Sequence, residues 1–139
     1  MATFAVIVTA AGKSSRFNDK NYKKPFAPLG GRAVWLHSVE RFMNRPDVKQ
    51  TIVTVAAEDR SFFDMKFGAN VAILGVQVVE GGEHRSDSVQ RALEKVKDDI
   101  DFVAVHDAAR PCIADKWIDQ LFEAVERSGV AYVTYALLL

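Results

Sequence analysis

The sequence is poor in the residues that stabilise small secreted domains. It has a single cysteine, Cys112, among 139 residues, which excludes a disulfide framework and any metal site built on several cysteines. Its three histidines, His37, His84 and His106, match the spacing of no zinc site. No hydrophobic run approaches the ~20 residues needed to cross a bilayer, and no basic region precedes the first apolar run as in a secretion signal. We therefore expect a protein of the reducing cytoplasm with no membrane contact.

Net charge is also lacking, because 18 Lys/Arg residues balance 18 Asp/Glu residues. This balance argues against binding to a nucleic-acid polymer. The charge is unevenly placed: residues 1–49 hold nine basic and three acidic residues (+6), and residues 50–139 hold nine and fifteen (−6). The cations are densest between Lys13 and Lys24, which indicates a site for a small anion. A solvated, lysine-rich loop would have the same composition and stays an alternative.

Hydrophobic residues make up 49% of the chain and charged residues 26%, as is usual for globular domains. Apolar runs predict strands at 3–9, 50–57, 71–79 (with a break at Gly75), 102–106 and 130–135. Helical periodicity predicts helices at 33–44, 58–67, 88–96 and 115–127. This alternation predicts one α/β domain with a Rossmann-like, doubly wound, mostly parallel sheet and helices on both faces.

Ligands in such folds bind at the carboxyl ends of the strands. The loop after the first strand, residues 10–16, combines small residues with Lys13 and Arg16, so its backbone N–H groups are able to form an anion-binding nest. Its spacing is neither a dinucleotide fingerprint nor a P-loop, and an ordinary polar turn would look similar. Lys24 precedes Pro25, which favours an extended backbone and a defined side-chain direction, although an exposed lysine beside a turn is equally compatible.

The third strand is followed by Gly81-Gly82, where a planar ring could lie against bare backbone. Asp87 with Gln90 resembles a capping box, and helix capping alone would explain the polar residues around it. We interpret His84 as a solvated loop residue.

Asp107 lies just beyond the fourth strand. A carboxylate there is well placed to bind a Mg²⁺ ion shared with substrate phosphates. Arg110 is expected to pair with Asp107 or with an anion. Cys112 has no neighbouring base that would make it a nucleophile, so we expect it to pack as a small apolar group.

These segments together resemble the 2-C-methyl-D-erythritol 4-phosphate cytidylyltransferase family of isoprenoid biosynthesis. The run VHDAARP (Val105–Pro111) is close to a family signature, and GGEHRSDSV (Gly81–Val89) is nearly as specific. Ala10-Ala11-Gly12 with Arg16, and Lys24 before Pro25, also match. The resemblance extends to about Gly129. Pentitol-phosphate cytidylyltransferases share much of the pattern, so this sister activity stays an alternative.

The resemblance implies transfer of a cytidylyl group from CTP to the sugar-alcohol phosphate 2-C-methyl-D-erythritol 4-phosphate, with release of diphosphate, by an enzyme that is a homodimer at full length. It implies Arg16 and Lys24 as catalytic residues, Asp107 as the Mg²⁺ ligand and Arg110 as part of the substrate region. The nucleotide-binding residues that it implies are Ala10, Ala11, Gly12, Lys13, Ser14, Ser15, Gly81, Gly82, Glu83 and Ser88.

The sequence departs from the family pattern at three places. Ser14 stands where the family usually has a second glycine, and Lys24-Pro25-Phe26 stands where it usually has Lys-Gln-Tyr. The chain finishes at Leu139, where the family continues with a dimerisation arm and further metal- and substrate-binding residues. We therefore expect residues 1–139 to be a nucleotide-binding domain without the family's C-terminal part, with little or no activity alone. A nucleotide-binding module without catalysis, or an unrelated doubly wound domain, stays an alternative.

Overall fold

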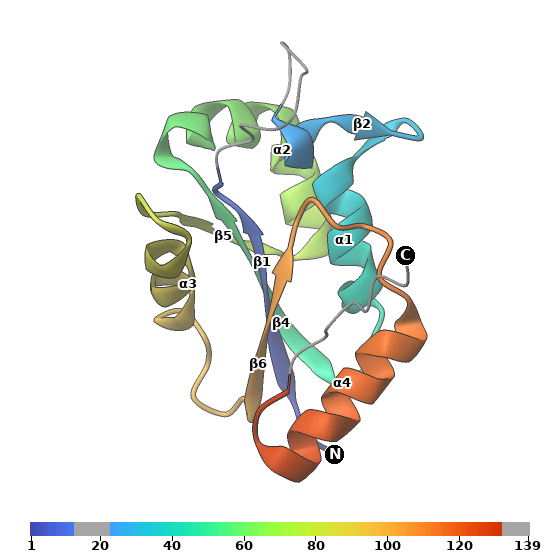
Figure 1. Cartoon of the computed structure of the whole chain (residues 1–139). Coiled ribbons are helices and arrows are strands. Elements are labelled where there is room, and N and C mark those ends of the chain that lie inside the picture. The colour runs from blue at the N-terminus through green and yellow to red at the C-terminus, as the bar shows by residue number, and fades with distance from the viewer. Residues whose placement is uncertain (13–22, 132–139) are drawn as a thin grey trace, which may run out of the picture.

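The computed structural model of the chain describes residues 1–12 and 23–131. Strands and helices alternate along it (Figure 1). The strands are β1 (Phe4–Ala10), β2 (Pro28–Leu29), β3 (Arg32–Ala33), β4 (Val48–Val55), β5 (Gln77–Glu80) and β6 (Phe102–Asp107). The α-helices are α1 (Val34–Met43), α2 (Arg60–Leu74), α3 (Arg85–Leu93) and α4 (Asp115–Ser128), and the 3-10 turns are η1 (Lys24–Phe26) and η2 (Ala57–Asp59). No helix in these described ranges is both long and apolar enough to cross a membrane.

Four parallel strands form the main sheet in the order β5-β4-β1-β6. β1 is central, and residues 4–10 are all buried, which explains its uninterrupted apolar sequence. From β1 the chain builds outward through β4 to β5 and then returns to place β6 on the other side of β1. The strand order therefore reverses beside β1, and ligand sites in such sheets lie outside the carboxyl ends of the strands at this reversal.

Helices cover both faces of the sheet, as the sequence predicts (Figure 1). Side chains alternate along β1: Val6 and Val8 belong to a large core that includes buried residues of α1, α2 and α4, whereas Ile7 belongs to a small core under α3. The large core is rich in aromatic rings. Trp35 from α1 lies 4.9 Å, centroid to centroid, from Phe63 of α2. The large face therefore provides most of the hydrophobic burial.

The predicted strand at 71–79 is wrong in its first half. Residues 71–74 form the last turn of α2, and the strand begins only at Gln77. Gly75 ends the helix with φ of 70°, a left-handed conformation that favours glycine. The apolar run around Gly75 is therefore a helix end, a cap and a strand start in succession, which hydrophobicity alone does not distinguish.

The predicted capping box on Asp87 and Gln90 is also wrong. α3 begins at Arg85, three residues before the predicted start. Asp87 lies inside the first turn, where its Oδ2 accepts a hydrogen bond of 3.1 Å from the backbone N–H of His84. The helix therefore begins directly at the end of the loop that contains Gly81 and Gly82. The predicted strand at 130–135 lies mostly outside the described residues.

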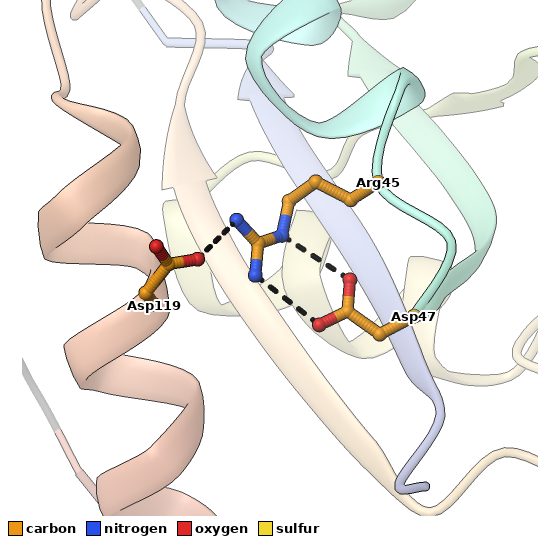
Figure 2. A network of polar contacts seen from close by, with 3 residues as sticks. All are labelled: Arg45, Asp47 and Asp119. Atoms are coloured by element: carbon orange, nitrogen blue, oxygen red, sulfur yellow. Dashed lines mark hydrogen bonds and ion pairs between the residues drawn. The ribbon is translucent and has the colours of Figure 1, made fainter.

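Two polar networks lie at the amino-terminal ends of the parallel strands, opposite the cleft end. Arg45, in the α1–β4 turn, donates two hydrogen bonds of 3.2 Å to the carboxylate of Asp47 and one of 2.7 Å to Asp119 of α4 (Figure 2). Its guanidinium carbon also lies 5.0 Å from the ring centroid of Phe122. Gln50 in β4 bonds to Gln77, to the Lys95 carbonyl and to the Lys97 N–H at 2.8–3.0 Å. These contacts connect the turns to the sheet.

Candidate functional site

A cleft with a volume of about 710 Å³ opens at the carboxyl ends of the four parallel strands. Each of these strands contributes residues at or just beyond its end. The lining residues are Thr9, Ala11 and Gly12 from β1 and its loop, Ala56, Ala57 and Glu58 after β4, Gly81, Gly82, Glu83, His84, Arg85, Ser88 and Arg91 after β5, and Asp107 from β6. The structure therefore brings the loops after β1, β5 and β6, predicted separately, to one cavity.

The β5–α3 loop comes so close to its neighbours that two of its residues must be glycine. A Cβ on Gly81 would collide with the Cβ of Ala11 and lie 2.6 Å from the Ser88 hydroxyl, and a Cβ on Gly82 would collide with the Cβ of Asp87. Both glycines have space for hydrogen only, so this wall of the cleft is bare backbone. This geometry explains the glycine pair and is compatible with the predicted contact to a planar ring.

Hydrogen bonds fix this backbone from several sides. The Gly81 N–H donates to the Val55 carbonyl at 2.8 Å, and the Gly81 carbonyl accepts from the Arg91 guanidinium at 3.1 Å. The Gly82 N–H donates to the Ser88 hydroxyl at 3.1 Å. The Ser88 hydroxyl in turn donates to the His84 carbonyl at 3.3 Å. Because Ser88 is buried, its hydroxyl is an internal brace of the loop as well as a lining group of the cleft.

Asp107 is the last residue of β6 and lines the same cleft. Its side chain is 44% exposed, so its carboxylate oxygens are accessible. The Thr9 hydroxyl lies 3.3 Å from Asp107 Oδ1, and the Arg110 Nε lies 3.6 Å from Oδ2. The predicted pairing of Arg110 with Asp107 is thus present. Arg110 itself lines a second cavity, on the β6 and α4 side, that Asp107 also borders.

The turn that begins at Asp107 is held by contacts from three elements. The Ala108 N–H donates to the Thr9 carbonyl of β1 at 3.0 Å, and the buried Ser38 hydroxyl of α1 donates to the Ala108 carbonyl at 2.7 Å. A ring nitrogen of His106 lies 2.8 Å from the Arg110 carbonyl. Burial lowers the pKa of His106, although its contact with the Arg110 carbonyl opposes this shift. The His106 ring is therefore a structural part of the turn.

Lys24 is the first residue of the 3-10 turn η1, so the extended backbone predicted for it before Pro25 is wrong. The extended residue is its neighbour Lys23, with φ of −71° and ψ of 150°. Phe26 anchors this turn, because its buried ring packs against Phe62, Phe63 and Phe67 with centroid distances of 5.8–6.1 Å. Lys24 is not among the lining residues of the cleft. The catalytic role given to it by resemblance stays a prediction.

Several predicted site residues lie outside the described residues: Lys13, Ser14, Ser15 and Arg16. Ala10, which is described, is buried at the end of β1 and does not line the cleft. Cys112 is exposed, so the expectation that it packs as an apolar group is wrong; the neighbouring Ile113 is buried in its place.

Sequence reasoning missed four polar contributors to the cleft: Thr9, Glu58, Arg85 and Arg91. Arg85 lies in the run Gly81–Val89, but no role was assigned to it. Thr9 was assigned to a buried strand and Arg91 to a helix, and neither belongs to a motif. The only available signal was position, since Glu58 follows a predicted strand and Arg91 lies on the third residue after Ser88, about one helical turn further on. His84 is exposed and borders the cleft, so its interpretation as a solvated loop residue is compatible with its position.

A divalent ion would meet one protein carboxylate at the Asp107 end of the cleft. The described residues contain no group of three or more His, Cys, Asp or Glu side chains able to hold a metal. A single accessible carboxylate suits Mg²⁺, which keeps several waters and takes its remaining ligands from substrate phosphates. Asp107 could therefore hold such an ion.

The family model and the curated relatives agree on one family. Residues 4–137 match the family model of 2-C-methyl-D-erythritol 4-phosphate cytidylyltransferase. The enzymes of that name from Rhodopirellula baltica and Endomicrobium trichonymphae are 36% and 40% identical, over 94% and 91% of this chain and 58% and 55% of their own lengths. The bifunctional IspDF of Campylobacter jejuni has a similar structure, with a TM-score of 0.74, 28% identity, and coverage of 91% of this chain and 31% of that one. The chain thus spans about half the length of the two curated relatives.

Proposed function

Because the chain belongs to the 2-C-methyl-D-erythritol 4-phosphate cytidylyltransferase family, we propose that it forms the CTP-binding part of a cytidylyl-transfer site. The observation that supports this proposal is the cleft itself. Bare backbone at Gly81 and Gly82 faces the same cavity as the Asp107 carboxylate, so one ligand with a planar base and a metal-bound phosphate chain is able to contact both.

The nucleobase is assigned to the β5–α3 loop. Cytosine lies against Gly81 and Gly82, with Ala11, Glu83 and Ser88 around it, whereas Ala10 is buried and does not line the cleft. The Ser88 hydroxyl uses its proton on the His84 carbonyl and accepts from the Gly82 N–H, so its remaining lone pair is available to a donor. The cytosine amino group is such a donor.

The triphosphate is assigned to the loop after β1, where the backbone from Ala11 through Gly12, Lys13, Ser14 and Ser15 holds its oxygens. Asp107 holds the Mg²⁺ ion, and Thr9 and Arg110 hold the carboxylate in place. When bound, Mg²⁺ neutralises developing negative charge on the phosphate oxygens.

In the proposed reaction a phosphate oxygen of the acceptor attacks the α-phosphorus of CTP. The new P–O bond forms as the bond between the α-phosphorus and the bridging oxygen breaks, and diphosphate leaves with the bonding electrons. Arg16 and Lys24 stabilise the charge that accumulates on the α-phosphate oxygens, and Arg110 contributes to the acceptor region. The acceptor is 2-C-methyl-D-erythritol 4-phosphate. Cytoplasmic location and homodimerisation of the full-length protein belong to the same proposal.

Calorimetric titration of the 139-residue chain with CTP tests the nucleotide site. We expect Mg²⁺-dependent binding of CTP, and weaker Mg²⁺ dependence in Asp107→Asn. Asp115→Asn is the matched control, because it removes a carboxylate at the start of α4. Absence of CTP binding, or equal Mg²⁺ dependence in Asp107→Asn and the wild-type chain, would contradict the proposal.

Diphosphate release separates binding from transfer. The chain is incubated with CTP, Mg²⁺ and either 2-C-methyl-D-erythritol 4-phosphate or ribitol 5-phosphate. Release with the first acceptor alone supports the proposed substrate, and release with ribitol 5-phosphate alone identifies the sister activity. CTP binding without release from either acceptor would restrict the function of residues 1–139 to nucleotide binding.

A further inference from the structure

Lys23 connects the Lys24 turn to the rim of the cleft. Its Nζ lies 2.7 Å from Asp59 Oδ2 and 3.5 Å from Glu58 Oε1, both on η2. The side chains of Lys23 and Asp59 are 28% and 16% exposed. The contact joins two segments that are 36 residues apart in the chain.

The backbone of Lys23 fixes the same turn. Its carbonyl accepts hydrogen bonds from the N–H groups of Phe26 at 2.9 Å and Ala27 at 3.1 Å. Phe26 anchors the far end of η1 in the aromatic core, whereas Lys23 anchors the near end through Asp59. Lys24 lies between these two anchors, so both determine where its Cα is placed.

The ion pair also changes the electrostatics of the cleft. Of the lining residues after β4, Glu58 is the acidic one, and Glu83 and Asp107 contribute two more carboxylates to the lining. A triphosphate is repelled by each carboxylate that is not neutralised. The ammonium of Lys23 lies within salt-bridge distance of Glu58 and of its neighbour Asp59, so it reduces the repulsion from that side.

We propose that Lys23 is a positioning residue of the nucleotide site: it holds the Lys24 turn against η2 and neutralises the carboxylates of Asp59 and Glu58 beside the bound triphosphate. Only the second part, the neutralisation of the two carboxylates, rests on the proposed function. The placement of the turn is a property of the chain without ligand, so the two parts are tested by different measurements.

The charge effect is measured by titrating CTP with Mg²⁺ into Lys23→Gln at low and high salt. We expect affinity to fall about three- to tenfold at ~50 mM NaCl and less than about twofold at ~500 mM NaCl, because salt screens the released carboxylates. Lys23→Arg keeps the charge and should keep wild-type affinity. The double variant Lys23→Gln/Asp59→Asn removes both charges and should regain most of the loss at low salt.

Lys49→Gln is the matched control for the loss of one positive charge. Lys49 is exposed at the opposite end of the sheet, beside the Gln50 network, so its removal should leave CTP affinity unchanged. An equal loss in Lys49→Gln, or a loss in Lys23→Gln that does not depend on salt, would overturn the charge part of the proposal.

Amide hydrogen exchange, measured by NMR without nucleotide, tests the placement of the turn. Lys23→Gln and Asp59→Asn should each accelerate exchange at the Phe26 and Ala27 amides about two- to fivefold, the range expected for loss of one partly exposed ion pair. The double variant should exchange no faster than either single variant. Unchanged protection in both single variants would refute the positioning role. If the wild-type chain fails to bind CTP, the proposed function fails while this measurement still decides the placement of the turn.

Discussion

The two ends of the parallel sheet use similar polar residues for different purposes. At one end, Arg45 pairs with Asp47 and with Asp119 and so connects the α1–β4 turn to α4 (Figure 2). At the other end, Asp107 and Glu83 line an open cleft. The pairs of Arg45 connect elements of the fold, whereas the Asp107 carboxylate, although it contacts Thr9 and Arg110, also faces a cavity where a ligand can reach it. The two sets share the same residue types, and what distinguishes them is whether the side chain lines the cavity.

The cleft end also depends on internal bracing. Ser88, Ser38 and Thr9 each use a buried hydroxyl to hold the backbone or the carboxylate that forms the cleft wall. Substitutions at this end should therefore change ligand binding more than stability, and substitutions at the opposite end should do the reverse. The following variants test this division, from the largest expected effect to the smallest.

Gly81→Ala should have the largest effect on binding. The added Cβ collides with Ala11 and approaches the Ser88 hydroxyl, and overpacking of this kind costs about 1–3 kcal/mol. We expect CTP affinity to fall about 10- to 100-fold, since that strain must be relieved by moving the cleft wall. Calorimetry measures the affinity, and urea unfolding measures the stability.

Gly68→Ala is the matched control for that substitution. Gly68 lies within α2, and a Cβ there meets no atom within 4 Å. The change should raise the free energy of unfolding by about 0.5–1 kcal/mol, because alanine favours helix, and should leave CTP affinity unchanged. Equal CTP affinities for the two alanine variants would show that the close approach at Gly81 does not shape the site.

Arg45→Ala should affect stability and leave binding intact. The variant removes both hydrogen bonds to Asp47, whose side chain is 17% exposed, and we expect the free energy of unfolding to fall by about 1–2 kcal/mol. Asp119→Asn should cost less, because the Asp119 side chain is 56% exposed. A change in CTP affinity of more than twofold in Arg45→Ala, which corresponds to about 0.4 kcal/mol, would show that the two ends of the sheet do not have separate roles.

Two variants, Thr9→Val and Thr54→Val, compare neighbouring threonines at the cleft end of the sheet. Thr9 and Thr54 are register partners on β1 and β4 and are both buried. The Thr9 hydroxyl contacts Asp107, whereas the Thr54 hydroxyl has no hydrogen-bond partner among the described residues. Thr9→Val should weaken Mg²⁺-dependent CTP binding by about 0.5–1.5 kcal/mol, and Thr9→Ser should restore it. Thr54→Val should be neutral or stabilising; a loss of CTP affinity in Thr54→Val equal to that in Thr9→Val would refute a specific role for Thr9.

The smallest effect should come from acidification, acting through His106. Burial lowers the pKa of His106 below its ordinary value of 6.5, so the folded state disfavours the protonated ring. Its contribution to stability is therefore complete above about pH 6.5 and decreases as the pH falls through 6.5 toward the lowered pKa. Urea unfolding at pH 7.5 and 5.5 should show less pH dependence in His106→Gln than in the wild-type chain.

Prediction from sequence was most successful where local patterns coincide with tertiary packing. The uninterrupted apolar run of β1 indicated a central buried strand, and residues 4–10 are all buried. The region around Gly75 was predicted wrongly, because an apolar helix end and an apolar strand start have the same hydrophobicity. The start of α3 was also missed, since Asp87 is acceptable both as an N-cap residue and, as found, within the first turn.

The candidate site was foreseen as separate loops, each placed after a strand by the rule for doubly wound folds. That prediction needed only residue order and strand periodicity, and it selected Gly81, Gly82 and Asp107, which line the cleft; their binding roles stay predictions. It could not find Arg91 or Thr9, because neither belongs to a recognisable motif. Their positions in the cleft arise from the direction of α3 and the register between β1 and β6.

The amino-acid sequence by itself determined the fold class, the family and the order of the loops that meet at the cleft, because periodicity and motifs are local properties of the chain. Only the tertiary structure decided which polar groups pair with one another across the fold and which face the cavity. Lys23 pairs with Asp59 across 36 residues, and the Ser38 hydroxyl reaches the Ala108 carbonyl across 70. Such contacts depend on how strands pair and helices pack, and no local pattern in the chain specifies them.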